Sequence, residues 1–538
     1  MLSYRKLAMR VLGRPLHTEG IDSPRPASQR AAAFALTAAM LITLTAPAFA
    51  ETWYIENGDI TVKASGTEGK NTVSQGNKKD VEDTNTIITN QNKDTASSHT
   101  VTIETNDKND KVEVTLKDVN IDTSSRNKAA VSVTGEGDTN IKLDGDNALK
   151  SDIYRSGIYG SGSGSLTISG GENDSLTAQG GSGANGISSS GSLTISGGTV
   201  TANGDDGGRG ISSSGSVTIS GGSTVTANGG SGTISGGDGI WSGGGVTISG
   251  GSTVTANGGN GGSLVGGDGI RSGGGLTVSD GTVTAKGGNG DSKDGYGGDG
   301  IRSGGVVTIS GNTVNAAGGY GGKVGGYGIC SFDRVAISGG TVEAAGGNGS
   351  TGGGSGIYSS VIDLSGSLEL TAKAGSPTGK ALLQNGRELD LDTIKDKLGP
   401  GAKVTATDAN GKTKQVSIPR PVEPEESSSS SDGGSATPSA PTSPLPGLTV
   451  TDKDGQRISY TSTQSGNTLT VCVGRFTASF RISLAALRQL RAEGIDTITF
   501  QTILCSTTLS LDELLAMGGE DAEAVLTHRF TDSSLTVG

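Results

Sequence analysis

Three aspartates occupy the same position of a repeated segment and are the first residues whose spacing suggests chemistry. Each stands two residues before an isoleucine in the motif Gly-Asp-Gly-Ile, and together they are Asp238, Asp268 and Asp299. If the repeats stack in register, the three carboxylates lie in neighbouring layers about 5 Å apart, where like charges repel. Calcium, which binds carboxylate and carbonyl oxygens in glycine-rich loops, could neutralise them and is the candidate metal. The alternative, which we prefer, is that Arg271 and Arg302 form ion pairs with them or that the turn is solvated.

Large side chains recur one residue past the same isoleucine, at a position that strand alternation should turn outward. Exposed aromatic rings can stack on sugar rings, and a guanidinium can bind hydroxyl groups or uronate carboxylates. The sequence therefore predicts a ligand-binding row made of Trp241, Arg271, Arg302, Tyr159 and Tyr358. The structural alternative is that Trp241 packs beneath the adjacent glycine loop.

Catalysis finds little support in the sequence. The three histidines, His17, His99 and His528, all lie outside the repeated segment. Asp205 and Asp206 offer further carboxylates, but no obvious acid or base partner accompanies them. We therefore assign no catalytic residue and expect a protein that is not an enzyme, with a polysaccharide lyase or hydrolase as the alternative.

The segment that must position these residues is written eight times between Ser156 and Ala372, with marker isoleucines at 158, 187, 211, 240, 270, 301, 329 and 357. Each copy contains three short runs, Gly-Ile-x-Ser, Val/Leu-Thr-Ile-Ser and Thr-Val-Thr-Ala, in which apolar and polar residues alternate as in strands. This pattern predicts an all-β fold, a right-handed parallel β-helix of stacked coils of about 29 residues. A β-sandwich is the alternative, but it is disfavoured because the identical residues recur between repeats, where they can stack.

Alternation also predicts which side chains of a coil face the core. In the clearest copy the inward residues should be Ile240, Val246, Ile248, Val254 and Ala256, and the outward ones Thr247, Thr253 and Thr255. At the corner after Thr-Val-Thr-Ala, we expect stacked amides to hydrogen-bond one another at Asn203, Asn228 and Asn257.

The composition limits which side chains can fill the core and which classes of partner the protein can bind. With 94 glycines and 3% aromatic residues, the core must be a thin column of aliphatic side chains. The formal net charge of −12 argues against nucleic acid and anionic membranes as partners, because those require basic patches. Cys472 and Cys505 could form a disulfide within one small domain or remain free buried thiols, and Cys330 would then be unpaired and exposed.

The remaining regions are organised around the repeats. A basic segment, an apolar run from Ala31 to Thr45 and the sequence Ala48-Phe49-Ala50 are typical of a secretory signal cut after Ala50. This predicts a secreted or cell-surface protein with no membrane span in the mature chain. The expected regions are a signal peptide (1–50), an N-terminal cap with irregular first coils (51–155), regular repeats (156–373), a C-terminal cap (374–418), a Pro/Ser-rich disordered linker (419–447) and a small α/β or α+β domain (448–538).

Helix signals lie outside the repeats. Ser483 and Ser510 are expected to cap the two helices of the last domain, and a short helix is expected over 391–398. Trp53 and Tyr54 are expected to pack in the N-terminal cap, which a β-helix needs to cover its first coil.

The repeat unit Gly-Ile-x-Ser... Val-Thr-Ile-Ser-Gly-Gly-x-Thr-Val-Thr-Ala, preceded by the strand-like residues 114–121, resembles secreted bacterial parallel β-helix proteins of the carbohydrate-binding, polysaccharide-lyase-like kind. The resemblance covers roughly residues 51 to 372. It implies binding of a polysaccharide or cell-surface glycan without cleavage. It also implies calcium held by aspartates of the Gly-Asp-Gly-Ile coils, a feature matched only by Asp238, Asp268 and Asp299. The competing expectation is an adhesin-like surface spacer without a small ligand.

Overall fold

The computed structural model describes residues 51–65 and 69–419, and, towards the end of the chain, 447–452, 456–458, 460–465, 467–473, 477–502, 506–519, 522–528 and 533–537. They belong to two compact units divided between Glu423 and Pro424, and each is described by itself. The predicted signal peptide and nearly all of the predicted linker lie outside the described residues.

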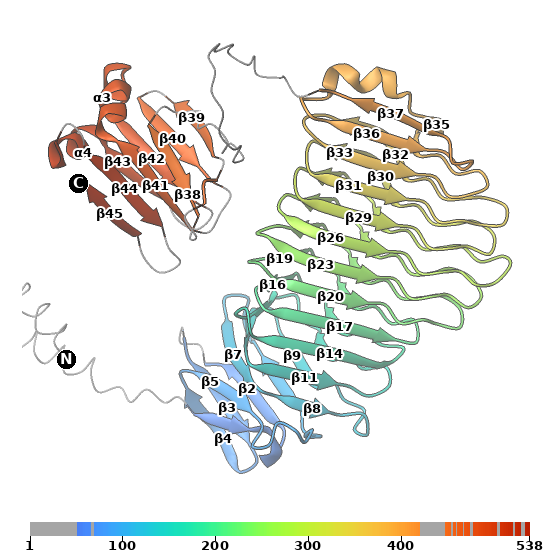
Figure 1. The fold of residues 1–538 in the computed structure, drawn as a ribbon. Helices are drawn as coiled ribbons and strands as arrows, with labels where there is room; N and C mark the ends of the chain where they lie inside the picture. Colours follow the sequence, from blue (N-terminus) through green and yellow to red (C-terminus); the bar gives the residue numbers. More distant parts are fainter. Residues whose placement is uncertain are drawn as a thin grey trace, which may run out of the picture. The chain divides into compact units, whose positions relative to one another are not determined.

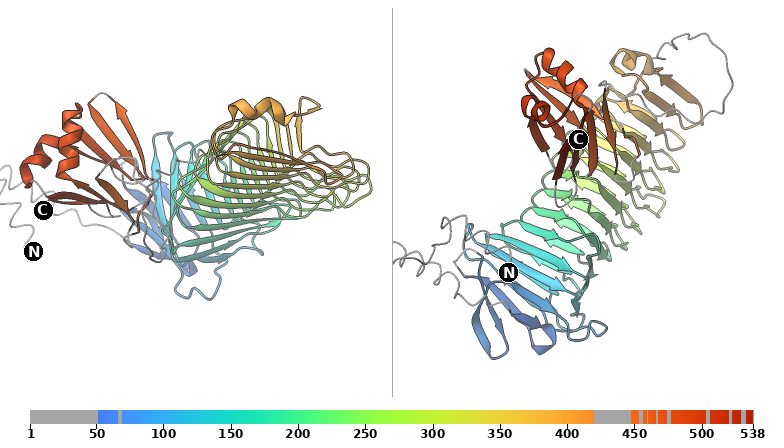
Figure 2. Two further views of the ribbon diagram at one scale, coloured as in Figure 1. Left: turned by 45° about the horizontal axis from the view of Figure 1, so that its top comes forward. Right: turned by 60° about the vertical axis from the view of Figure 1, so that its left-hand side comes forward.

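The first unit is a parallel β-solenoid of about 14 turns (Figures 1 and 2), which confirms the predicted fold class. Its strands form three stacks, and each strand pairs in parallel with the equivalent strand of the next coil. The Gly-Ile-x-Ser runs form the first stack: β12 (Ile158–Gly160), β15 (Ile187–Ser189), β18 (Ile211–Ser213), β21 (Ile240–Ser242), β24 (Ile270–Ser272) and β27 (Ile301–Ser303).

The other two runs of each coil form the second and third stacks. The second holds β13 (Leu166–Ser169), β16 (Leu193–Ser196), β19 (Val217–Ser220), β22 (Val246–Ile248), β25 (Leu276–Val278) and β28 (Val307–Ile309). The long strands β30 (Ile329–Ile337) and β32 (Ile357–Leu364) continue both the first and the second stack. The third holds β14 (Ser175–Ser182), β17 (Thr199–Asp205), β20 (Thr224–Asn228), β23 (Ser252–Asn257), β26 (Gly281–Lys286), β29 (Thr313–Ala317), β31 (Thr341–Ala345) and β33 (Glu369–Lys373).

The core of this unit is an aliphatic column, as predicted. The five expected inward residues are at most 1% exposed: Ile240, Val246, Ile248, Val254 and Ala256. Thr247 and Thr253 are exposed and Thr255 is half-buried. Equivalent positions of neighbouring coils are buried in the same cluster, so like side chains stack on one another along the solenoid.

Glycines and asparagines shape the corners between strands. A Cβ atom at Gly267 would lie 1.9 Å from the carbonyl oxygen of Gly237 in the preceding coil, far inside van der Waals contact. Asn228 Nδ2 donates to Asn203 Oδ1 and Asn257 Nδ2 donates to Asn228 Oδ1, both at 2.8 Å. The predicted amide ladder is therefore confirmed.

Serines of the Gly-Ile-x-Ser runs form a second ladder, which was not predicted from the sequence. Their hydroxyls are buried and donate to a corner carbonyl of the preceding coil: Ser242 to Gly215 at 2.9 Å, Ser272 to Gly244 at 3.0 Å and Ser303 to Gly274 at 2.8 Å. A buried hydroxyl is costly unless it is hydrogen-bonded, and here the neighbouring coil supplies the acceptor.

The N-terminal part begins the solenoid with irregular coils. Its strands are β1 (Thr52–Tyr54), β2 (Ile60–Ala64), β3 (Asn71–Gln75), β4 (Lys78–Asp83), β5 (Thr86–Thr89), β6 (Val101–Glu104), β7 (Lys111–Lys117), β8 (Asn120–Asp122), β9 (Val131–Thr134), β10 (Asp138–Asp144) and β11 (Asp146–Lys150), with a 3₁₀ turn η1 over Ile55–Asn57. β3 is antiparallel to both β2 and β4, so β2 to β4 form an antiparallel sheet at this end. Trp53 is buried and its Nε1 donates to Asp83 Oδ2 at 2.8 Å, as expected for a cap residue, whereas Tyr54 is exposed.

The C-terminal end adds one more coil before it closes. β34 (Leu382–Gln384) and β36 (Lys403–Thr407) still pair in parallel with β32 and β33. β35 (Arg387–Glu388) then pairs antiparallel with β34, and β37 (Thr413–Ser417) pairs antiparallel with β36, which ends the stacks. The predicted short helix is a 3₁₀ helix, η2 (Leu391–Lys397), capped by the side chain of Asp390.

The described residues of the second unit form two four-stranded sheets and two helices. One sheet is β38 (Leu448–Thr451), β41 (Ala478–Ser483), β44 (Glu523–His528) and β45 (Ser533–Val537); the other is β39 (Thr461–Ser465), β40 (Thr468–Cys472), β42 (Thr497–Gln501) and β43 (Ser506–Ser510). The helices α3 (Leu484–Ala492) and α4 (Leu511–Met517) begin after Ser483 and Ser510, whose side chains accept from backbone N–H groups as predicted.

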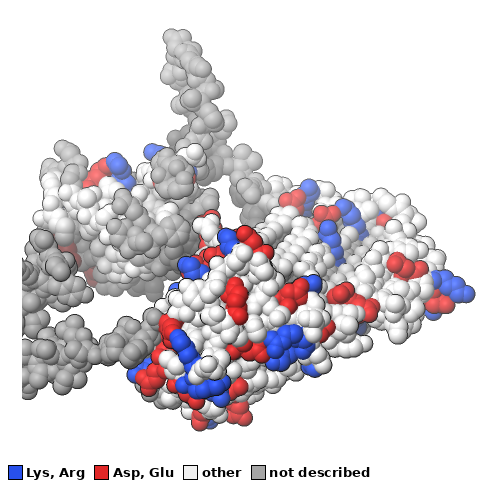
Figure 3. Space-filling view, turned by 90° about the horizontal axis from the view of Figure 1, so that it is seen from below, with Lys and Arg blue, Asp and Glu red and all other residues white. Residues whose placement is uncertain are grey.

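The described surface is polar and carries charges of both signs. Figure 3 shows acidic and basic side chains lying side by side, with wide uncharged areas between them. Within the described ranges no helix has the length and apolar character needed to span a membrane.

Candidate functional site

The three repeated aspartates stand at the corner that leads into β21, β24 and β27, and they bond to one another's backbone. Asp238 Oδ1 accepts from the N–H of Asp268 at 2.9 Å, and Asp268 Oδ1 accepts from the N–H of Asp299 at 2.7 Å. Asp299 Oδ1 accepts in turn from Tyr327 N–H at 2.7 Å. We call these three residues the aspartate ladder, because each side chain supports the backbone of the next coil.

A neutral side chain performs the same function two coils earlier. Asn185 Oδ1 accepts from the N–H of Arg209 at 2.8 Å. The hydrogen bond therefore requires a short side-chain carbonyl and not a negative charge, which separates the structural role of this position from any role of the carboxylate.

The second oxygen of each aspartate faces an arginine, which agrees with the ion-pair alternative. Asp299 Oδ2 lies 3.2 Å from Arg302 and Asp268 Oδ2 lies 3.9 Å from Arg271. Asp238 Oδ2 lies 3.2 Å from Nε of Arg209, a residue that is not among the predicted site residues. The ladder is thus flanked on its outer side by a line of guanidinium groups.

Burial disfavours the ionised form of two of these carboxyls. It raises the pKa of Asp268 to about 8, with further upward contributions from the charges of Asp299 and Asp238. Burial also raises the pKa of Asp299, but only to about 6, because the backbone N–H of Tyr327 and the charge of Arg302 favour its ionised form. Burial and the neighbouring charges therefore favour the protonated form of the middle carboxyl more strongly than that of Asp299.

These contacts do not fit a calcium site. Every Oδ1 already accepts a backbone N–H, and every Oδ2 faces a guanidinium, which would repel a cation. The described residues include no cluster of three or more His, Cys, Asp or Glu arranged to hold a metal ion. The ligand set implied by the family resemblance is therefore not assembled at Asp238, Asp268 and Asp299.

On the outer face, arginine and aromatic side chains lie beside one another on consecutive coils. The pairing of β18, β21, β24 and β27 places Trp241 next to Arg271, and Arg271 next to Arg302. The guanidinium of Arg209 lies over the Trp241 ring, 4.4 Å from its centroid. Trp241 is half-buried, and its exposed part and its arginine neighbours share one surface.

Aromatic residues continue this line beyond Arg302. Arg302 lies over the ring of Phe332, which is 54% exposed, at 5.2 Å from its centroid. Tyr327 and Tyr358 stack with their ring centroids 5.1 Å apart. We call the whole set the Arg–aromatic row, made of Arg209, Trp241, Arg271, Arg302, Tyr327, Phe332 and Tyr358.

Three members of this row lay outside the predicted set for identifiable reasons. Arg209 stands at the aspartate position of its coil, so only the stacked register reveals that it reaches Trp241. Phe332 lies where the register shifts between β30 and β32, so its position does not match the repeat pattern of the other coils. Tyr327 also stands at the aspartate position, and its stacking on Tyr358 could have been suspected from that register.

Tyr159 is exposed but does not join the row. Its partners along the first stack are Ser188 and then Ser212, so three coil spacings separate it from Trp241. At about 4.8 Å per coil this is roughly 14 Å. The predicted ligand-binding residues are thus divided, with Tyr159 alone and the other four in one row.

The expectation that Cys330 is exposed is wrong. Cys330 is 1% exposed, although it occupies an outward position of β30. Its neighbours on the adjoining coils are Arg302 and Tyr358, whose much larger side chains flank the small thiol. Burial raises its pKa to about 12, so the thiolate is scarce at neutral pH.

Of the remaining cysteines and histidines that the structure describes, Cys472 and His528 belong to the second unit and His99 to the N-terminal part of the first. Cys472 Sγ lies 3.4 Å from Gln501 Oε1, and Cys505 lies outside the described residues, so their disulfide stays a prediction. His99 contacts Asp59 at 3.2 Å in the N-terminal part. His528 is buried in the second unit, where its Nε2 contacts Thr507 Oγ1 at 2.9 Å.

Comparison of the chain with protein-family models, with curated proteins and with solved structures found no match.

Proposed function

We propose that this protein is exported and binds an acidic polysaccharide, without cleaving it, along the Arg–aromatic row. The observation that carries the proposal is the alignment of Arg209, Trp241, Arg271 and Arg302 on consecutive coils, with the Arg209 guanidinium over the indole ring. Export rests on the sequence pattern of residues 1–50.

Geometry favours a linear polymer over a compact ligand. Equivalent side chains on neighbouring coils are about 4.8 Å apart, close to the length of one sugar ring in an extended chain. Successive guanidinium groups can therefore meet successive sugar residues, and the half-buried Trp241 can stack on one ring. A rigid solenoid keeps these groups in place, so little conformational entropy is lost on binding.

Charge favours a polymer that carries carboxylates. The protein as a whole is acidic, yet this row holds three arginines whose side chains are 36 to 49% exposed. Their aspartate partners are buried behind them, and the Arg271 guanidinium lies farthest from its partner, 3.9 Å from Asp268 Oδ2. A planar guanidinium binds a carboxylate with two parallel hydrogen bonds, which a neutral sugar cannot match.

Isothermal titration of the purified protein with oligogalacturonate and with neutral oligosaccharides of equal length tests the proposal. The double variant Arg271→Gln/Arg302→Gln should weaken oligogalacturonate binding at least about tenfold, because two charge-assisted contacts are removed. Arg387→Gln, an exposed arginine of β35, serves as the matched control and should bind as the wild type does. The proposal is wrong if wild type does not bind any uronate oligomer, or if the double variant binds equally well.

The unbroken strand register of the first stack from β12 to β30 favours one other candidate, a structural surface spacer. A spacer predicts that glycans do not bind and that Trp241→Ala and the three Asp→Ala changes leave folding and surface display intact. Appearance of new reducing ends or unsaturated products during the titrations would instead indicate a polysaccharide hydrolase or lyase.

A further inference from the structure

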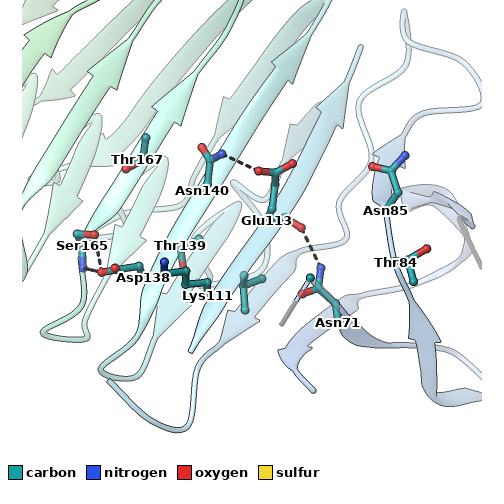
Figure 4. Close-up of a pocket in the computed structure, with 12 residues that line it drawn as sticks. Asn71, Thr84, Asn85, Lys111, Glu113, Asp138, Thr139, Asn140, Ser165 and Thr167 are labelled. Atoms are coloured by element: carbon teal, nitrogen blue, oxygen red, sulfur yellow. Dashed lines mark hydrogen bonds between the residues drawn. The ribbon is translucent and has the colours of Figure 1, made fainter. Parts of the chain in front are cut away.

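A separate cavity of about 430 Å³ lies between the N-terminal antiparallel sheet and the first coils of the solenoid (Figure 4). One wall comes from the start of β3 and from the turn between β4 and β5, with Asn71, Thr84 and Asn85. The other wall comes from β7, β10 and the start of β13. Its volume is within the about 300–1,000 Å³ of typical small-molecule sites.

Polar groups on the second wall are held in place by neighbours from adjacent coils. Asp138 Oδ1 accepts from both the N–H and the hydroxyl of Ser165, at 3.1 and 2.6 Å. Glu113 Oε2 accepts from Asn140 Nδ2 at 3.0 Å, as Figure 4 shows. In each carboxylate one oxygen is fixed by the protein, and the other can accept a hydrogen bond from a ligand.

Asn71 joins the two walls. It is 6% exposed, and its Nδ2 donates to Thr86 Oγ1 at 3.0 Å and to the carbonyl oxygen of Glu113 at 2.8 Å. This buried amide connects β3 to β7 by a hydrogen bond. Because the two walls are held together in this way, the cavity is formed before a ligand arrives. A preformed site avoids the entropy cost of ordering its walls on binding.

The lining suits a ligand rich in neutral hydroxyl groups. Among the described residues that line it are amides, hydroxyls and the carboxylates of Glu113 and Asp138, with Lys111 as their single cation and no aromatic ring. Two carboxylates against one ammonium disfavour an anion.

We propose that this cavity binds one or two neutral sugar residues, with Asp138 and Glu113 accepting hydrogen bonds from sugar hydroxyls and Asn85 and Thr167 completing the contacts. The site is distinct from the Arg–aromatic row: it lies on other coils, uses carboxylates where the row uses guanidinium groups, and selects neutral over acidic sugars. A polysaccharide that contains both neutral and acidic sugars could contact both sites of the solenoid.

Titration calorimetry with cellobiose, lactose, mannobiose and xylobiose, and with galacturonic acid as the charged comparison, tests this assignment. At least one neutral disaccharide should bind more tightly than galacturonic acid. Asp138→Asn keeps an oxygen for the Ser165 bonds and Asn85→Ala changes an exposed side chain, so both variants should fold, as a melting curve will verify. Each should weaken binding, with Asp138→Asn losing at least about tenfold.

Matched variants separate this site from the first one. Asp144→Asn lies on the same strand outside the lining and should bind the neutral disaccharide as wild type does. Arg271→Gln/Arg302→Gln should also leave this binding unchanged while it lowers affinity for oligogalacturonate. The assignment is overturned if none of the four disaccharides binds at about 10 mM, or if binding survives Asp138→Asn undiminished.

Discussion

Replacing Asp268 by asparagine should stabilise the solenoid at alkaline pH. Asparagine keeps the Oδ1 atom that accepts from the N–H of Asp299, just as Asn185 does for Arg209 in an earlier coil. The change removes a carboxyl that must ionise while buried between Asp238 and Asp299. The loss of Arg271 as a partner costs little, because that contact is 3.9 Å long and the arginine is half-exposed.

The size of the effect follows from proton linkage. The folded state raises the pKa of Asp268 to about 8 from an ordinary value of 3.8, so the folded protein holds this proton more tightly than the unfolded chain. The free energy of unfolding should therefore fall as the pH rises from about 4 through about 8, and be lowest above that range. One pKa unit corresponds to about 1.4 kcal/mol, so the shift could lower the free energy of unfolding by at most about 6 kcal/mol. Local solvent penetration makes the loss smaller, and we expect about 2 kcal/mol.

Urea denaturation followed by circular dichroism at pH 5 and pH 9 measures this effect. Wild type should lose stability between the two pH values, and Asp268→Asn should lose distinctly less, so that the variant is the more stable protein at pH 9. Asp294→Asn, at an exposed aspartate, is the control and should change stability by less than about 0.5 kcal/mol. A variant less stable than wild type at pH 9, or a wild type that gains stability towards pH 9, would refute the reasoning.

Three further changes test other parts of the solenoid. Asn228→Ala breaks both bonds of the amide ladder and should lower the free energy of unfolding by about 1–3 kcal/mol, measured by urea denaturation against Asn410→Ala in an exposed turn. Gly267→Ala should prevent folding or lower the melting temperature sharply, since its Cβ would meet a carbonyl oxygen at 1.9 Å. The control Gly519→Ala should be tolerated, because no described atom lies within 4 Å of the Cβ that it adds. Cys330 should resist alkylation by iodoacetamide in the native protein at pH 8 and react after denaturation, because burial raises its pKa to about 12; rapid native labelling, located by mass spectrometry, would contradict its burial.

The sequence was sufficient to predict the solenoid because one repeated pattern determines the inward faces, the strand pairing and the hydrogen bonds at the corners. The positions of Ile240, Val254 and their counterparts determined the inward faces, and the 24- to 31-residue spacing determined which strands pair. Asn228 at a repeated corner predicted a ladder that the hydrogen bonds confirm. These predictions hold because in a stacked fold identical residues are also spatial neighbours.

Features that depend on unequal neighbours were not predictable in the same way. Cys330 is buried because Arg302 and Tyr358 are large, which strand alternation alone does not consider. The cavity near Asp138 requires β3 to run antiparallel beside the first coils, and the irregular N-terminal sequence carries no repeat that reveals this pairing. Both results come from contacts between residues that follow no common pattern.

The aspartate ladder shows how such a fold can acquire a binding surface without losing its register. The hydrogen bond at this corner needs only a side-chain carbonyl, so Asn185 and Asp268 are equivalent for the backbone. A carboxyl at the same place additionally faces an arginine on its outer side and holds that guanidinium against the solenoid, as Asp299 holds Arg302. Since the strand pairing is unaffected, each coil can vary at this position independently of its neighbours. Consecutive coils that carry an arginine therefore form a row, and the number of such coils determines its length.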